Sequence, residues 1–344
     1  MATARRLGGV AVGGIAVGAL TVLELRHRRA LAADDEWARL CSPLSGGGAQ
    51  VTSRDGTLIH VETLGDDDGG PTFVLAPGWT EDALLWGPVA RGLVQRGFRV
   101  VVYDLRGQGA SGLAPAQDYS LARYGEDLEA VLAATAADGA GQELIVVGHS
   151  LGGMSVVAWA VAHQPRSRIR AAALVNTAVA GVIKESRVSV RGVPAVVKHW
   201  FGVHVVLDEP LPRLPVSTAA NRALLRSLAF GPHATEAQIA LLERMQWSCP
   251  TAVRTAAGRS IARMDLSWAV PALTVPTIVI AGEVDLLLPP AHSEKIAAAL
   301  PDLVDLVVLA EVGHISPLEA SGRLVDELVR LASVAAHPAR SGLD

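Results

Sequence analysis

A serine between two glycines, at the junction of an apolar strand and an apolar helix, carries the clearest chemistry in this sequence. Ser150 stands in the pentapeptide Gly148–Gly152, a G-x-S-x-G pattern that directly follows the apolar run Glu143–Val147. Such a turn lifts the serine side chain clear of the sheet, and the glycines avoid collisions in a strained backbone. Ordinary glycine-rich turns share the pattern, but this strand–turn–helix setting favours a nucleophile. His149 points elsewhere in such a turn, so we do not expect it to act as the base.

A serine nucleophile needs a base that an acid orients. Two later loops supply such residues: Asp285 follows the predicted strand Thr277–Ala281, and His314 follows the predicted strand Leu303–Leu309. The chain between them has room for one helix and one strand, so both loops open beside the serine at the carboxyl edge of a parallel sheet. Glu283 competes for the acid position, but it alternates to the other face from Asp285.

The negative oxygen that forms on an attacked carbonyl needs two backbone N–H donors. One donor is expected from Leu151, directly after the serine, and the other from the loop after the predicted strand Thr72–Ala76. That loop reads Pro77-Gly78-Trp79, and we assign the second donor to the N–H of Trp79. This chemistry requires neither a cofactor nor a metal ion.

Short apolar runs alternate with helical stretches after a glycine linker at 46–48. Continuous apolar runs separated by helices are typical of a parallel sheet covered on both faces. The predicted fold class is therefore α/β, a mostly parallel sheet flanked by helices. A Rossmann arrangement is disfavoured because no G-x-G-x-x-G follows the first strand. The remaining predicted strands are Leu58–Leu64, Phe98–Tyr103, Glu143–Val147 and Ala171–Val175, and the predicted helices are Leu84–Arg96, Glu126–Ala137, Met154–His163 and Ala291–Leu300.

Residues 182–270 break this alternation with prolines and helical patches, and only Val203–Leu207 in them resembles a strand. We interpret them as a helical cap inserted between core segments 50–181 and 271–335. The aromatic residues of the cap either pack it onto the core or line a pocket. They are Trp200, Phe201, Trp247 and Trp268.

Residues 1–32 form a separate segment with an uncharged apolar run, Leu7–Leu23, between arginines. As a helix the run measures about 25 Å, near the thickness of a bilayer core, and residues 7–25 are predicted to anchor the protein in a membrane. The arginines after the run favour a cytoplasmic body. A cleaved export signal ending near Ala32 and an ordinary packed apolar helix remain alternatives. Glycine pairs four residues apart in the run would permit weak dimerisation.

Charge and cysteine content exclude several classes of protein. The net charge is −4 although five arginines lie in the first 29 residues, so the body is acidic and nucleic-acid binding is not expected. Half of the residues are hydrophobic, enough for a sizeable buried core. Cys41 and Cys249 lie far apart in sequence and indicate neither a metal site nor a disulfide framework.

Four motifs in order resemble the α/β-hydrolase superfamily, in particular its serine esterases, cofactor-free haloperoxidases and C–C bond hydrolases. They are Pro77-Gly78-Trp79 with Trp86, the Asp104–Ser111 turn (DLRGQGAS), the elbow at Ser150, and the pair Asp285 and His314. The resemblance covers about residues 50–335. It implies the α/β-hydrolase fold and a structural role for the Asp104–Ser111 turn.

The same resemblance shows where this chain differs from members of the superfamily. Family members carry histidine–glycine where this chain has Pro77-Gly78, and that histidine helps to shape the loop. Epoxide hydrolases and haloalkane dehalogenases carry aspartate where this chain has Ser150. Some lipases place the acid near the position of Asn176, but an amide cannot take that role.

The resemblance and the residues together lead us to expect hydrolysis of a carboxylic ester or thioester, a small molecule with an apolar acyl group. Acyl transfer or perhydrolysis would use the same three residues, with an alcohol or peroxide in place of water. A non-catalytic binding protein on a hydrolase-like scaffold is the third possibility.

Overall fold

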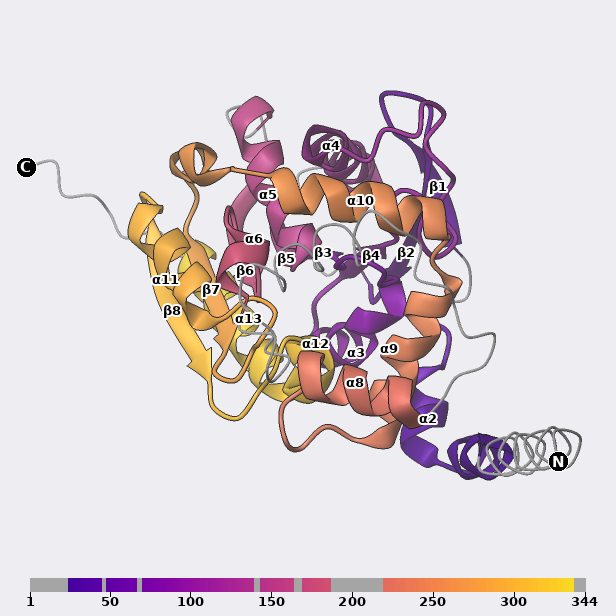
Figure 1. Cartoon of the computed structure of the whole chain (residues 1–344). Helices are drawn as coiled ribbons and strands as arrows, with labels where there is room; N and C mark the ends of the chain where they lie inside the picture. The colour runs from indigo at the N-terminus through magenta and orange to yellow at the C-terminus, as the bar shows by residue number, and fades with distance from the viewer. Residues whose placement is uncertain are drawn as a thin grey trace, which may run out of the picture.

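The structure, a computed structural model, describes residues 24–44, 48–66, 70–138, 143–163, 169–186 and 219–336. At their centre lies an eight-stranded sheet in the order β1-β2-β4-β3-β5-β6-β7-β8 (Figure 1). Strands β1 and β2 are antiparallel to their neighbours, whereas the strands β3 to β8 are parallel to one another. The predicted mostly parallel α/β fold is therefore confirmed. The strands are β1 (Gly48–Thr52), β2 (Leu58–Leu64), β3 (Thr72–Ala76), β4 (Val100–Tyr103), β5 (Leu144–His149), β6 (Ile169–Val175), β7 (Thr277–Gly282) and β8 (Leu303–Leu309).

Side chains along the central strands alternate between two apolar cores, one on each face of the sheet. In β3, Val74 belongs to one core and Phe73 to the other. All five β3 residues are buried, which explains why this strand is a continuous apolar run. The first core includes α4 (Leu121–Asp138), α5 (Leu151–Ala162) and α11 (Pro290–Ala299), and the second includes α3 (Gly87–Gln95), α12 (Ser316–Glu319) and α13 (Ser321–Ala336).

Several predicted boundaries were wrong. Strand β1 was missed, and its first residue, Gly48, had been assigned to a linker, because this edge strand is mostly exposed and lacks an apolar run. The stretch predicted as one helix over Leu84–Arg96 is a 3-10 helix, η1 (Ala83–Trp86), followed by α3. Helix α4 begins five residues earlier than predicted, at Leu121.

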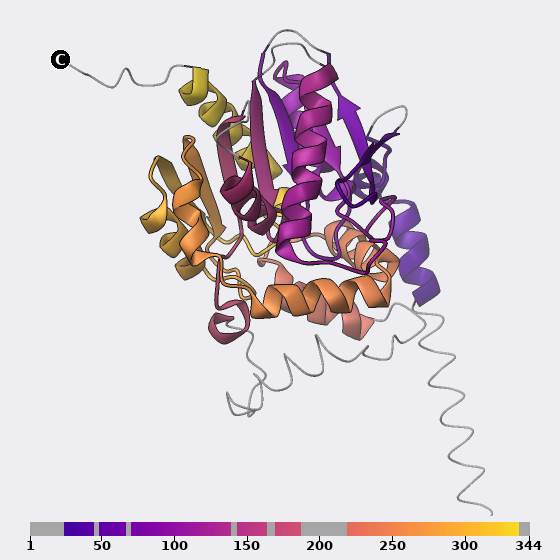
Figure 2. The same ribbon diagram turned by 90° about the horizontal axis from the view of Figure 1, so that it is seen from above.

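A helical insertion separates β6 from β7 in sequence although the two strands pair in the sheet. Its helices lie across one end of the sheet (Figure 2). The predicted Val203–Leu207 strand, Trp200 and Phe201 lie outside the described residues. Trp268 is 68 % exposed, so neither interpretation offered for the cap aromatics fits its ring. In the described part of the insertion the helices are α6 (Val182–Glu185), α8 (Ala219–Ala229), α9 (Glu236–Ser248), α10 (Thr251–Arg263) and the 3-10 helix η4 (Ser267–Ala272).

Of the N-terminal segment, the structure describes residues 24–32, which are helical and precede α2 (Asp35–Leu40). Glu24 is buried there and pairs at 3.0 Å with Arg222 of α8. Among the described residues, no helix combines the length and apolar character that a membrane crossing requires. The predicted anchoring run Leu7–Leu23 lies outside those residues.

Candidate active site

Four neighbouring strands bring four polar residues to one edge of the sheet. Strand β5 leads directly into Ser150 and β6 directly into Asn176, while Asp285 and His314 follow shortly after β7 and β8. The strands are adjacent and parallel in this same order, so their carboxyl ends lie side by side. This is the edge at which open α/β sheets bind ligands.

The turn at Ser150 has the strained backbone that its sequence predicted. Ser150 has φ 50° and ψ −115°, between the last residue of β5 and the first of α5. A Cβ on Gly148 would lie 2.5 Å from the carbonyl of Gly152, and one on Gly152 would lie 2.4 Å from the carbonyl oxygen of Ala76. Both glycines are therefore required by close backbone contacts. The second contact also shows that the loop after β3 packs against the elbow.

Hydrogen bonds to its N–H and to its carbonyl hold the backbone of Ser150 in place. Its N–H donates to the carbonyl of Val175 at 3.0 Å, and its carbonyl accepts a bond of 2.7 Å from the hydroxyl of Thr177. These bonds join the elbow to the end of β6. The strain at Ser150 is thus supported by its surroundings, as a positive φ on a non-glycine residue requires.

Asp285 and His314 form a buried pair. Nδ1 of His314 lies 2.7 Å from Oδ2 of Asp285, and the second oxygen, Oδ1, accepts backbone N–H bonds from Leu287 and Leu288, each 2.9 Å long. Burial by itself would lower the pKa of His314. The charge of Asp285 and its hydrogen bond outweigh burial, so the pKa of His314 is raised.

Glu283, the competing acid, faces away from this pair. Its Oε2 accepts the backbone N–H of Glu311 at 3.0 Å in an exposed position. The structure therefore brings Asp285, and not Glu283, to the imidazole of His314.

Asn176 was not predicted as part of the site. Its side-chain Nδ2 donates to Oδ2 of Asp285 at 3.0 Å and to the carbonyl of Gly313 at 3.2 Å. The hydroxyl of Ser316 donates to its Oδ1, which fixes the orientation of the amide. In the sequence, Asn176 stands near the position where some lipases carry the acid, and no role of its own was predicted for it. The available signal was its place at the carboxyl end of β6, between the strands that precede Ser150 and Asp285.

Glu81 and His149 form a second buried carboxylate–imidazole pair, also not predicted. Nδ1 of His149 lies 2.9 Å from Oε2 of Glu81, and its Nε2 donates to the backbone carbonyl of His314 at 2.9 Å. Both ring nitrogens of His149 are thus engaged, as expected for a residue that is not the base. Oε2 of Glu81 also accepts the N–H of Gly78. Glu81 therefore helps to hold the loop in which proline replaces the family's histidine.

The loop that carries Trp79 contacts the insertion as well as the elbow. The indole Nε1 of Trp79 donates to the carbonyl of Arg254 in α10 at 3.0 Å. Trp79 is half-buried and packs on the same apolar core as Leu151 and Val253. The loop, α10 and the residue directly after Ser150 therefore share one apolar core.

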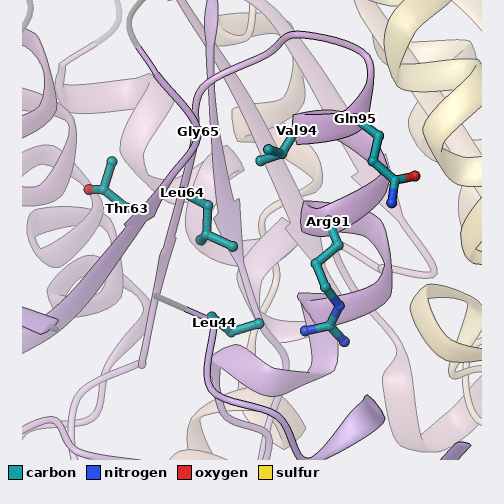
Figure 3. Close-up of a pocket in the computed structure, with 7 residues that line it drawn as sticks. All are labelled: Leu44, Thr63, Leu64, Gly65, Arg91, Val94 and Gln95. Atoms are coloured by element: carbon teal, nitrogen blue, oxygen red, sulfur yellow. The ribbon is translucent and has the colours of Figure 1, made fainter. Parts of the chain in front are cut away.

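A pocket of about 460 Å³ lies elsewhere, between β2, α3 and the residues before β1 (Figure 3). Leu44, Leu64 and Val94 form its apolar lining, with Arg91 as its charged side chain. Nη2 of Arg91 already donates to the carbonyl of Arg39 at 3.0 Å. None of the candidate catalytic residues lines this pocket, so it is not the active site. Within the described ranges, no three His, Cys, Asp or Glu side chains are grouped as a metal site would require.

Comparison with known proteins agrees with this fold. The chain is 26 % identical over 264 residues to a non-heme haloperoxidase of Rhodococcus erythropolis, covering 77 % of this chain and 92 % of that protein. Among solved structures it resembles an esterase from Exiguobacterium antarcticum (TM-score 0.70, 20 % identity, 83 % of this chain and all of that one). It also resembles a bromoperoxidase from Bacillus anthracis (TM-score 0.67, 17 % identity, with the same coverage). A sequence model of the alpha/beta hydrolase fold matches residues 71–321. The chain therefore belongs to the α/β-hydrolase fold family of enzymes.

Proposed function

We propose that this protein hydrolyses a carboxylic ester or thioester, with Ser150 as nucleophile, His314 as base and Asp285 as acid. The observation that carries the proposal is the 2.7 Å contact between Asp285 and His314. The two residues lie in the loops after β7 and β8, which follow the elbow strand β5 and β6 in the sheet. A serine at a strained elbow and an imidazole oriented by a carboxylate, both at the carboxyl end of the sheet, are the parts that an activated nucleophile requires.

The proposed reaction proceeds in two halves. His314 takes the proton of the Ser150 hydroxyl while Oγ bonds to the carbonyl carbon of the substrate. The resulting oxyanion is stabilised by the N–H groups of Leu151 and Trp79. When the tetrahedral intermediate collapses, His314 returns the proton to the leaving alcohol or thiol, and the acyl group remains on Ser150. Water, deprotonated by His314, then attacks this ester. The acid is released as the acyl–oxygen bond breaks and His314 returns the proton to Oγ of Ser150. Asp285 stabilises the imidazolium in both halves.

An apolar acyl group fits the surroundings of the elbow. Leu151, Trp79 and Val253 of α10 belong to one apolar core, and the helices of the insertion lie across this end of the sheet (Figure 2). Apolar walls with a few convergent polar groups are typical of small-molecule sites. A series of p-nitrophenyl esters graded by acyl length tests the proposal. We expect turnover that depends on Ser150, with kcat/KM rising with chain length before it levels off.

The similarity to a haloperoxidase supports a second candidate. Hydrogen peroxide in place of water would attack the same acyl-enzyme and release a peracid and the free serine. Adding peroxide to the ester assay and measuring peracid separates this activity from hydrolysis. A binding protein without activity is the remaining alternative, and it would neither turn over esters nor react with a fluorophosphonate.

We also propose, from the sequence, that residues 7–25 hold the protein at a membrane, with the body on the cytoplasmic side. The support is the uncharged run Leu7–Leu23 and the arginines that flank it. An exported protein cleaved near Ala32 is the alternative. Attachment to the membrane would bring a lipophilic substrate within reach of the site.

A further inference from the structure

The loop that carries His314 is bonded to the insertion as well as to the core. The backbone N–H of His314 donates to the carbonyl of Ala229 at 2.7 Å, and the N–H of Ile315 donates to the same oxygen at 3.3 Å. Ala229 is the last residue of α8 in the insertion. The position of the His314 backbone therefore depends directly on where α8 ends.

Glu319 adds a second connection between the same two segments. Its Oε2 accepts the N–H of Gly231, two residues after α8, at 2.6 Å. The same oxygen accepts the N–H of Gly313, directly before His314, at 3.2 Å. One carboxylate oxygen thus bridges the insertion and the histidine loop.

The two segments are in close backbone contact at this bridge. A Cβ on Gly231 would lie 2.1 Å from the carbonyl oxygen of Glu311, and one on Gly313 would lie 2.5 Å from the carbonyl carbon of Phe230. With no space for a side chain on either glycine, one segment cannot shift without moving the other. Close-packed regions transmit such displacements.

The Asp285 contact alone does not fix the position of His314. The carboxylate orients the ring through Nδ1, but the imidazole can reach Ser150 only if its backbone is also correctly placed. In the core, the amide of Asn176 holds the carbonyl of Gly313 and the ring of His149 holds that of His314. On the opposite side, the N–H groups of Gly313 and His314 depend on Glu319 and Ala229.

We propose that Glu319 is a positioning residue that couples the cap to the catalytic histidine, so that the placement of α8 sets the alignment of His314 with Ser150. This inference rests on the proposed function of Ser150, Asp285 and His314. Under it, the insertion both covers the substrate and determines the geometry of the base.

The test compares Glu319→Leu with Glu319→Gln in the full chain. Leucine leaves the N–H groups of Gly231 and Gly313 without an acceptor, whereas glutamine keeps one oxygen that can serve both. We expect Glu319→Leu to lower kcat about tenfold or more at nearly constant KM, since sub-ångström to ångström misplacement of a catalytic group costs up to about a hundredfold. Glu319→Gln should stay within about threefold of the parent. Glu294→Leu, an exposed carboxylate on α11, serves as the matched control and should match the parent.

Two measurements separate positioning from loss of stability. Active sites are first counted by end-point reaction with a fluorophosphonate, so that kcat is expressed per intact site. The downfield proton resonance of the Asp285–His314 hydrogen bond is then recorded by NMR, and it should shift or broaden in Glu319→Leu alone. Parent kcat per site with an unchanged resonance in Glu319→Leu would overturn the inference. If the parent itself neither turns over esters nor labels at Ser150, the proposed function fails, and the resonance still reports whether Glu319 positions His314.

Discussion

Asn176 donates a hydrogen bond to the same carboxylate oxygen of Asp285, Oδ2, that lies against Nδ1 of His314. The two contacts measure 3.0 Å and 2.7 Å. Oδ1 of the same carboxylate accepts two backbone N–H bonds, so both of its oxygens are hydrogen-bonded. Such an arrangement holds the Asp285 carboxylate in one fixed orientation. It also makes the amide of Asn176, at φ 44°, part of the machinery that orients the base.

Replacing Ser150 by alanine removes the nucleophile and little else. We expect ester turnover in Ser150→Ala to fall by about 10⁴ to 10⁶, as for other triad serines. The circular dichroism spectrum and the thermal midpoint should stay close to those of the parent. Ser248→Ala, an exposed serine on α9, is the control and should keep full activity. A quarter of the parent activity in Ser150→Ala would disprove the assignment of the nucleophile.

Replacing Asp285 by asparagine preserves its shape but removes its charge. An amide turned towards His314 either presents a donor to a donor or forces the wrong tautomer, so kcat should fall by about 10⁴. Glu283→Gln makes the same chemical change two residues away, at an exposed carboxylate that accepts the N–H of Glu311, and it should be nearly neutral. The opposite order of severity in steady-state assays would reassign the acid to Glu283.

Asn176→Asp tests the partner of the acid. A carboxylate at this position would face Oδ2 of Asp285 and the carbonyl of Gly313, both acceptors, and would lose the two bonds that the amide donates. Aspartate tolerates a positive φ, so the backbone change is small. We expect kcat/KM to drop by about ten- to a hundredfold, because the base loses its fixed orientation. Gln117→Glu, the same amide-to-acid change at an exposed residue, should leave kcat/KM unchanged.

The pH dependence of kcat/KM reports on His314. Burial lowers its pKa, but the Asp285 charge and hydrogen bond raise it more, so the net shift is upward. A base acts in its neutral form, so activity falls as the pH drops through the raised pKa. We expect the acidic limb of kcat/KM to have its midpoint above the ordinary histidine value of about 6.5. The limb should move to lower pH in the residual activity of Asp285→Asn. A midpoint below 6 in the parent would contradict the upward pKa shift that Asp285 is expected to cause in His314.

The membrane proposal is tested by removing the N-terminal run. The full chain should sediment with membranes and resist washing with high salt or carbonate, since burial of apolar side chains is not screened by ions. A chain beginning at Glu24 retains the ion pair with Arg222 and should remain in the supernatant while still labelling at Ser150. Full-length protein in the supernatant would refute the anchor. A mature N-terminus near Ala33 in the culture medium would support export instead.

The sequence by itself determined the features that depend on neighbouring residues. Buried strands such as Thr72–Ala76 are continuous apolar runs because both faces are covered, and Gly148 is required by its close contact with Gly152 in the same turn. Ser150, Asp285 and His314 were also chosen from the sequence, because their motifs occur in the chain order serine, acid, histidine.

Only the tertiary structure decided which distant groups meet. His149 contacts Glu81, 68 residues earlier, and the carbonyl of His314, 165 residues later. Asn176 reaches Asp285 across 109 residues, and Glu319 reaches Gly231 across 88. No local pattern encodes these contacts, because a hydrogen bond depends on where the sheet and its insertion place two groups in space. Strand β1 was missed for a related reason: an exposed edge strand is defined by pairing with β2, and its own side chains need not be apolar.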